Sequence, residues 1–219
     1  MLGPFGGSMM GSGQGDLVTH IGSGWIAADQ PITLSSLGAE VGDILFVSAP
    51  YPESGANRAA YSGSGWTFTD FSWGAAAPSF PVNARAGWKI LDTLANVTTS
   101  TSIHGTAWAL YRGPTSANLV YLTSDLNHST RTVTLPSKAA TTRAVALFCH
   151  QISTSSNATP SAGWTDRYHG MDGQNIFVFD LLDSFSPPDS GHSCEITGIA
   201  ASTVCAHLVI GFELLRADP

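Results

Sequence analysis

Two short stretches of the sequence, Gly65-Trp66-Thr67 and Gly163-Trp164-Thr165, decide the fold. Each lies in the same series: a Thr-Leu pair, an apolar run, the Gly-Trp-Thr, a run ending in Asp and a run ending in Arg. The other members are Thr33-Leu34, 44–49, 88–92 and 107–112 in the first half, and Thr134-Leu135, 145–150, 177–183 and 206–216 in the second half. Five landmarks in one order at similar spacing indicate an internal repeat.

The runs between these landmarks are typical of β-strands. Most are four to nine residues long, rich in β-branched and aromatic residues, and bounded by Gly, Pro, Asn or Ser. No stretch has a clean helical period with both caps, and a single short helix is expected near 35–41. The sequence therefore predicts an all-β protein, an antiparallel, jelly-roll-like β-sandwich built from two similar β units.

We expect residues 1–15 to form a flexible Gly-rich arm and residues 16–219 to form a single sandwich with pseudo-repeat halves 33–112 and 134–216. Four apolar residues interrupt the arm: Leu2, Phe5, Met9 and Met10. They favour an arm that docks on a partner and orders there. A frayed terminus or an expression remnant is the alternative, and the arm has no basic and continuous apolar regions like those of a secretory signal.

Composition excludes several classes of protein. The net charge is −7 and only 11% of residues are charged, against about 25% in an average domain. The chain therefore has no basic patch for nucleic acid. It also lacks an apolar run near the ~20 residues of a membrane-spanning helix. Because 43% of residues are hydrophobic, it can bury a real core and is not disordered.

Each of the three cysteines lies near a histidine, as Cys149-His150, His192-x-Cys194 and Cys205-x-His207. If the last two strands paired, His192, Cys194, Cys205 and His207 could form a tetrahedral zinc site. A Cys194–Cys205 disulfide is a further alternative. We expect neither a metal nor another cofactor, because a free cysteine commonly packs as a small hydrophobic side chain.

The sequence has no nucleophile elbow, phosphate-binding loop, metalloprotease helix or dinucleotide fingerprint. Glycoside hydrolysis would need a pair of carboxylates. The candidates are Asp70, Asp92, Asp166, Asp172, Asp180 and Asp183. They are scattered, and Asp92 and Asp183 end matching runs of the two halves, which favours a turn or strand-capping role. We therefore expect a protein that is not an enzyme, with a hydrolase as the least favoured alternative.

Aromatic residues in loops are the candidates for ligand binding. Trp73 lies in a Gly/Ala/Pro-rich loop, where its ring could stack on a sugar or simply anchor the loop. Tyr51, Tyr61 and Tyr168 are lesser glycan candidates. The repeated Trp66 and Trp164 are expected to be structural, each sealing an end of the sandwich.

The matching segments of the repeat carry a resemblance to a known group of proteins. They are 42–49, 65–67, 84–92 (ARAGWKILD), 107–113 (AWALYRG), 134–137, 144–150, 160–165 and 206–215. Over about residues 33–216 the chain resembles β-rich structural proteins of tailed-bacteriophage virions and phage-like particles, of the head-decoration, head-spike or tail-appendage type. The arm is not part of the shared pattern.

This resemblance implies a virion location and no catalytic residues. The partners it implies are other virion proteins (capsid, portal or tail, spike or fibre) and further copies of the chain in a homo-oligomer. Host surface polysaccharide is a further expected partner, and neither nucleic acid nor membrane insertion is expected. The alternative function is a free carbohydrate-binding module or lectin.

Overall fold

The computed structural model describes residues 18–52, 59–72, 82–100, 105–126, 131–134, 142–151, 158–171, 175–182, 193–197 and 206–215. Within these ranges every paired strand is antiparallel, and the one helical element is the 3-10 turn η1 (Leu34–Leu37). The predicted all-β antiparallel sandwich is confirmed. The short helix expected near residues 35–41 is this turn, which ends at Gly38 in the left-handed conformation with φ 72°.

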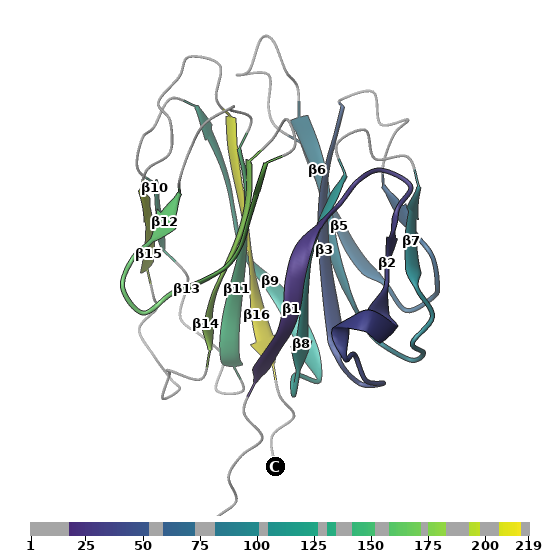
Figure 1. Cartoon of the computed structure of the whole chain (residues 1–219). Helices are drawn as coiled ribbons and strands as arrows, with labels where there is room; N and C mark the ends of the chain where they lie inside the picture. The colour runs from purple at the N-terminus through teal and green to yellow at the C-terminus, as the bar shows by residue number, and fades with distance from the viewer. Residues whose placement is uncertain are drawn as a thin grey trace, which may run out of the picture.

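The first half of the chain forms a five-stranded and a three-stranded sheet (Figure 1). The larger sheet has the order β1 (Thr19–Ile26), β8 (Thr106–Arg112), β3 (Ile44–Pro52), β6 (Val82–Ile90) and β5 (Thr67–Ser72). The smaller sheet has the order β2 (Pro31–Ile32), β7 (Val97–Ser100) and β4 (Ala60–Tyr61).

The second half repeats this arrangement strand for strand. Its larger sheet has the order β13 (Thr165–Met171), β14 (Asn175–Leu182), β11 (Thr142–Gln151), β16 (Ala206–Leu215) and β9 (Ser116–Leu126). Its smaller sheet has the order β10 (Arg131–Thr134), β15 (Ser193–Thr197) and β12 (Thr159–Pro160). Among the described strands all pairing is within one half, and the repeated unit runs from β1 to β8 and from β9 to β16.

The four sheets stack as layers, with the two five-stranded sheets facing each other in the middle (Figure 1). Three apolar cores fill the spaces between layers. The central core takes side chains from both large sheets, including Phe46, Phe148 and Phe212. The first-half core, with Leu45 and Trp108, and the second-half core, with Phe177 and Trp164, lie under the small sheets. Each large sheet is therefore buried on both faces.

This layering corrects one expectation about the last strand. Alternation predicts that Ile210, Phe212 and Leu214 face the core, and they do. The mixed composition of the opposite face, which carries Val209 and Glu213, predicts that this face is half-exposed or contacts a neighbouring chain. Both side chains are instead buried, at 0% and 5% exposure, because the second-half core covers that face of β16.

The described ends of the body lie at one pole. Thr19 pairs with Arg112, and Thr115 N–H donates to the carbonyl of Leu215 at 2.7 Å. Figure 1 shows β1 beginning and β16 ending at the bottom of the view. The strands β3 and β5 run away from this pole, so Pro52 and Ser72 end at the opposite one, where Pro52 pairs with Val82 and Ser72 with Asn83.

Candidate functional site

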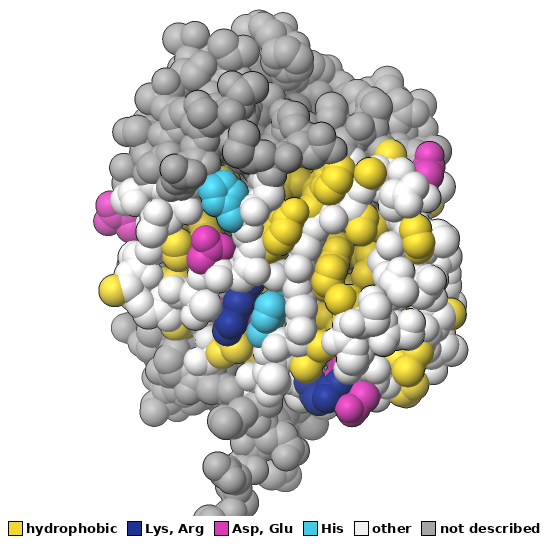
Figure 2. Space-filling model, in the orientation of Figure 1, with side chains coloured by type: hydrophobic (Ala, Val, Ile, Leu, Met, Phe, Trp, Pro, Cys, Tyr) yellow, Lys and Arg dark blue, Asp and Glu magenta, His cyan; other side chains and the backbone are white. Residues whose placement is uncertain are grey.

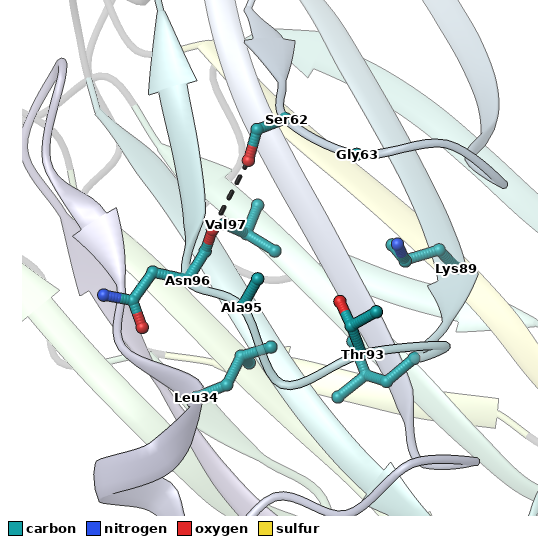
Figure 3. A pocket seen from close by; sticks show the side chains of 9 residues that line it. Leu34, Ser62, Gly63, Lys89, Thr93, Ala95, Asn96 and Val97 are labelled. Carbon is teal, nitrogen blue, oxygen red and sulfur yellow. Dashed lines mark hydrogen bonds between the residues drawn. The ribbon is translucent and has the colours of Figure 1, made fainter.

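A pocket of about 210 Å³ opens beside the small sheet of the first half (Figure 3). Its apolar wall is formed by Leu34, Leu91, Ala95 and Val97. Its polar wall carries Ser62, Thr93, Asn96 and the amine of Lys89. Three separate segments meet here, namely the turn η1, the loop after β4 and the chain between β6 and β7. In Figure 3 Lys89 and Thr93 lie on one side of the pocket and Leu34, Ala95 and Val97 on the other.

Lys89 is a buried cation at the wall of this pocket, with 4% exposure. Its Nζ donates to Asp92 Oδ1 and to the Ser64 carbonyl, both at 3.0 Å. The hydrogen bond from Lys89 lowers the pKa of Asp92 below its ordinary value. Because an ammonium has three N–H donors, these two bonds leave one donor without an acceptor among the described residues.

An aromatic cluster stands beside the lysine. The Trp66 ring lies 5.3 Å from Phe68 and 5.2 Å from Tyr61, measured between centroids. Lys89 Nζ lies 5.9 Å from the Trp66 centroid, within reach of a cation–π contact. Trp66 Nε1 donates to the Ser62 carbonyl at 3.1 Å, which fixes the ring against the loop that borders the pocket.

The second half has an apolar side chain at the position of Lys89. Thr67 pairs with Trp88 and Thr165 pairs with Asp180, so Lys89 and Leu181 occupy equivalent positions. Leu181 belongs to the second-half core together with Trp164, which is 8% exposed.

The loops beside these two tryptophans also differ. Ser62 Oγ accepts from the Thr98 amide, and its counterpart Ser161 Oγ accepts from the Glu195 amide. Between this serine and the tryptophan the first half has three residues and the second half has two. The extra length includes Ser64, whose carbonyl accepts from Lys89. The lysine and the longer loop are therefore linked by a hydrogen bond, and together they distinguish the first half from the second.

A second polar cluster lies at the seam between the two large sheets. Arg167 Nε donates to both oxygens of Asp180, at 2.8 and 2.9 Å, and Tyr111 Oη donates to Asp180 Oδ2 at 3.2 Å. Asp180 is fully buried, and Arg167 lies at the bulge between Asp166 and Tyr168 of β13. Burial raises the pKa of Asp180 although the bonds from Arg167 and Tyr111 act in the opposite direction. The bulge redirects one side chain into the interface.

Strand β1 completes this seam cluster. Ser23 Oγ donates to the Arg167 carbonyl at 2.9 Å, and the His20 ring meets Tyr111 edge-on at 5.4 Å. Burial, together with the charge of Arg167, lowers the pKa of His20 to about 4. Figure 2 shows a basic and a histidine side chain side by side where β1 passes β13. The cluster joins residues of both halves and has the character of a clamp between them.

The glycan candidates are not gathered into one site. Tyr61 lies in β4 with 8% exposure, and its hydroxyl is 3.3 Å from Thr106 Oγ1, so it is not an exposed loop residue. Tyr168 lies in β13 and packs against the central core. Tyr51 is near the end of β3 at the far pole. Trp73, which follows β5 there, lies outside the described residues. The arm residues Leu2, Phe5, Met9 and Met10 also lie outside them.

The zinc hypothesis required the strands that carry Cys194 and His207 to pair, and they do not. Cys194 is in β15, which pairs with β10 and β12, whereas His207 is in β16, between β11 and β9. Cys194 is a free, buried thiol. His192 and Cys205 lie outside the described ranges, and no group of three or more metal-binding side chains occurs within them.

The positions of the cysteines explain their burial. Ile32 pairs with Val97 in the first half, and Val133 pairs with Cys194 in the second. Cys194 thus fills the place of a valine as a small apolar side chain, and burial raises the pKa of its thiol to about 11. Cys149 likewise packs in the second-half core.

The candidate aspartates are spread over the molecule, and three hold cations. Asp70 is paired with Arg85 at 2.8 Å, Asp92 with Lys89 and Asp180 with Arg167. Burial raises the pKa of Asp166. Asp172 and Asp183 lie outside the described residues. At the pole of the chain ends a further pair joins Arg112 to Asp43 through two bonds of 2.9 and 3.0 Å.

Sequence reasoning missed the two residues that make these sites distinctive, Lys89 and Arg167. Lys89 is one of only two lysines in the chain, and it stands where the repeat has Leu181, a signal that the aligned halves contain. Arg167 has no such signal, because its role depends on a bulge.

In the described part of the chain no helix is long and apolar enough to cross a membrane. Comparison with known proteins adds no relative: no protein family, no curated protein and no solved structure matches the chain.

Proposed function

We propose that this protein is a structural component of a tailed-phage virion or phage-like particle, attached through residues 1–15, and that it is not an enzyme. The observation that carries the proposal is the polarity of the body. The described chain begins at Val18, beside the end of β16, at one pole of a four-layer stack. An arm that precedes Val18 is therefore joined at that pole and leaves the opposite pole free to face outward.

The interior supports a role in assembly. The two large sheets meet through a continuous apolar core and are clamped by Arg167, Asp180 and Tyr111 at its edge. Asp70 and Asp180, two of the candidate carboxylates, each pair with an arginine across neighbouring strands. These charges serve strand and layer contacts. A doubled sandwich of this kind is a rigid spacer between an attachment point and a distal surface.

The test is co-sedimentation with particles purified from the source strain. Three forms are compared: the full chain, a deletion of residues 1–15, and a variant in which Leu2, Phe5, Met9 and Met10 are changed to serine. The third keeps the length and glycine content of the arm and removes only its apolar groups. We expect the full chain to sediment with particles and both altered forms to remain in solution while still folded by circular dichroism. Failure of the full chain to associate would overturn the proposal.

A further inference from the structure

We infer that the pocket beside Lys89 is a binding site for one unit of a neutral saccharide. The inference stands apart from the particle role, because such a site would serve a free lectin equally well. The first observation is the burial of the charged amine of Lys89. Burying an ammonium is unfavourable unless it is paired and hydrogen-bonded, and the repeat shows that the same sheet position is filled by Leu181 in an apolar core.

The fold therefore does not require a charge at this position. What the first half has added is two coupled features: the amine of Lys89 and the longer loop that supplies the Ser64 carbonyl. The second half, built on the same strands, buries Leu181 together with Trp164 instead. A buried cation beside a pocket in one copy, where the other copy has a leucine, is expected if the first copy binds a ligand.

The chemistry of the walls selects the ligand. Lys89 is held at 3.0 Å by Asp92, so the pair is close to neutral. Asp92 itself does not line the pocket, and it compensates the charge of the lysine whose remaining donor faces a ligand. Thr93 and Asn96 add further polar groups. The hydroxyls of a sugar ring match these neutral groups and a lysine donor whose charge Asp92 already compensates, whereas an anion would compete with the Asp92 carboxylate for that lysine.

The opposite wall suits the carbon face of a sugar. Leu34, Leu91 and Val97 are apolar and almost fully buried, and they line the same cavity. The half-buried Trp66 ring is not part of this wall. It lies beside Lys89 and is bonded to Ser62, a residue that lines the pocket, so its indole N–H can report on the site. A volume of about 210 Å³ is smaller than the roughly 300–1,000 Å³ of pockets for drug-sized ligands. The pocket therefore fits a single monosaccharide unit.

The experiment is a titration of the ¹⁵N-labelled full chain followed by NMR. The probes are glucose, galactose, mannose and N-acetylglucosamine, with glucuronate and inorganic phosphate as anionic comparisons. The readout is the indole N–H signal of Trp66, assigned by its loss in Trp66→Phe. We expect at least one neutral sugar to move this signal saturably, and neither anion to do so. The variant Lys89→Leu, which installs the residue of the repeat, should weaken that sugar at least tenfold.

The matched control is Lys138→Leu, which removes the other lysine and changes the net charge equally; it should leave binding unchanged. If Lys89→Leu does not fold, Thr93→Val tests the same wall, with weaker binding expected. The inference is overturned if no neutral sugar shifts the Trp66 signal, if only glucuronate or phosphate does, or if the folded Lys89→Leu or Thr93→Val variant binds like the wild type. No particles are involved, so this result is independent of the co-sedimentation test.

Discussion

Removing the cation of the seam cluster should destabilise the protein far more than its single ion pair suggests. In Arg167→Met the apolar stem is kept and the charge is lost. Among the described residues, the carboxylate of Asp180, at 0% exposure, then keeps only the Tyr111 hydroxyl as a hydrogen-bond partner. A buried charge stripped of its partner typically costs about 3–5 kcal/mol. Because Tyr111 still donates, we expect about 3 kcal/mol, roughly a hundredfold change in the folding equilibrium.

The double variant separates charge from packing. In Arg167→Met/Asp180→Asn the buried group is a neutral amide, so the loss should fall to about 1–2 kcal/mol. The control is Asp70→Asn, because Asp70 and Arg85 form a pair of similar length whose side chains are 30% and 19% exposed. A partly exposed pair should cost only about 0.2–1 kcal/mol.

The assay is equilibrium urea unfolding at pH 7, followed by tryptophan fluorescence and by circular dichroism. Coincident transitions would support two-state analysis of the wild type and the three variants. Two results would refute the reasoning: Arg167→Met no more destabilising than Asp70→Asn, or a double variant as unstable as Arg167→Met alone. Either would mean that the Asp180 carboxylate is not an uncompensated charge once the arginine is gone.

Three further predictions concern pH, packing and the thiols. The pKa of His20 is about 4 in the folded protein and about 6.5 unfolded, so the stability that depends on the neutral ring is complete above pH 6.5 and is lost as the pH falls toward 4. Because the ring is partly exposed, we expect this loss in the free energy of unfolding to be about 1–2 kcal/mol. His20→Phe should flatten this part of a Tm–pH profile. Gly87→Ala places a Cβ against the Phe68 ring and 2.7 Å from the Thr67 carbonyl oxygen, whereas a Cβ at Gly22 is 3.5 Å from its nearest atom. In thermal unfolding, Gly87→Ala should lower the free energy of unfolding by about 1–3 kcal/mol and Gly22→Ala should change it little. Equal Tm values for the two variants would contradict this. Cys194→Val, which copies Val97, should cost less than about 1.5 kcal/mol, and the Cys194 thiol, with its pKa of about 11, should react with a thiol reagent only on unfolding.

Most of the fold could be predicted from the sequence because the patterns that indicate strands are local. Runs such as 44–49 and 144–152 predict central strands through their mostly apolar composition. The threonine of each Gly-Trp-Thr motif is the first residue of an equivalent strand, β5 or β13. The number of sheet layers could not be predicted in the same way. A strand buried on both faces reads as continuous or only partly alternating hydrophobicity, which is why the face of Val209 and Glu213 was expected to be half-exposed.

The two sites depend on contacts between residues that are far apart in the sequence, and these contacts could not be predicted from local patterns. The seam joins Tyr111 to Asp180, 69 positions apart, and requires a bulge that turns Arg167 inward. The pocket joins three segments, and its lysine looks like an ordinary strand residue until it is placed beside Leu181. The glycan candidates were chosen from loop composition, and that criterion does not identify a residue such as Trp66, whose exposure is set by a neighbouring loop of one extra residue.

The return of both ends of each repeat to one pole has a consequence for how such a molecule can arise. The first unit finishes at Arg112 and the next starts at Ser116, so a three-residue connection is enough to copy the unit in tandem without redirecting any strand. Placed beside its copy, each unit covers a sheet face that would otherwise meet water. After such a duplication the two copies can diverge. One copy can keep an apolar core around Leu181 and Trp164 that stabilises the fold, while the other can acquire polar groups at the equivalent position.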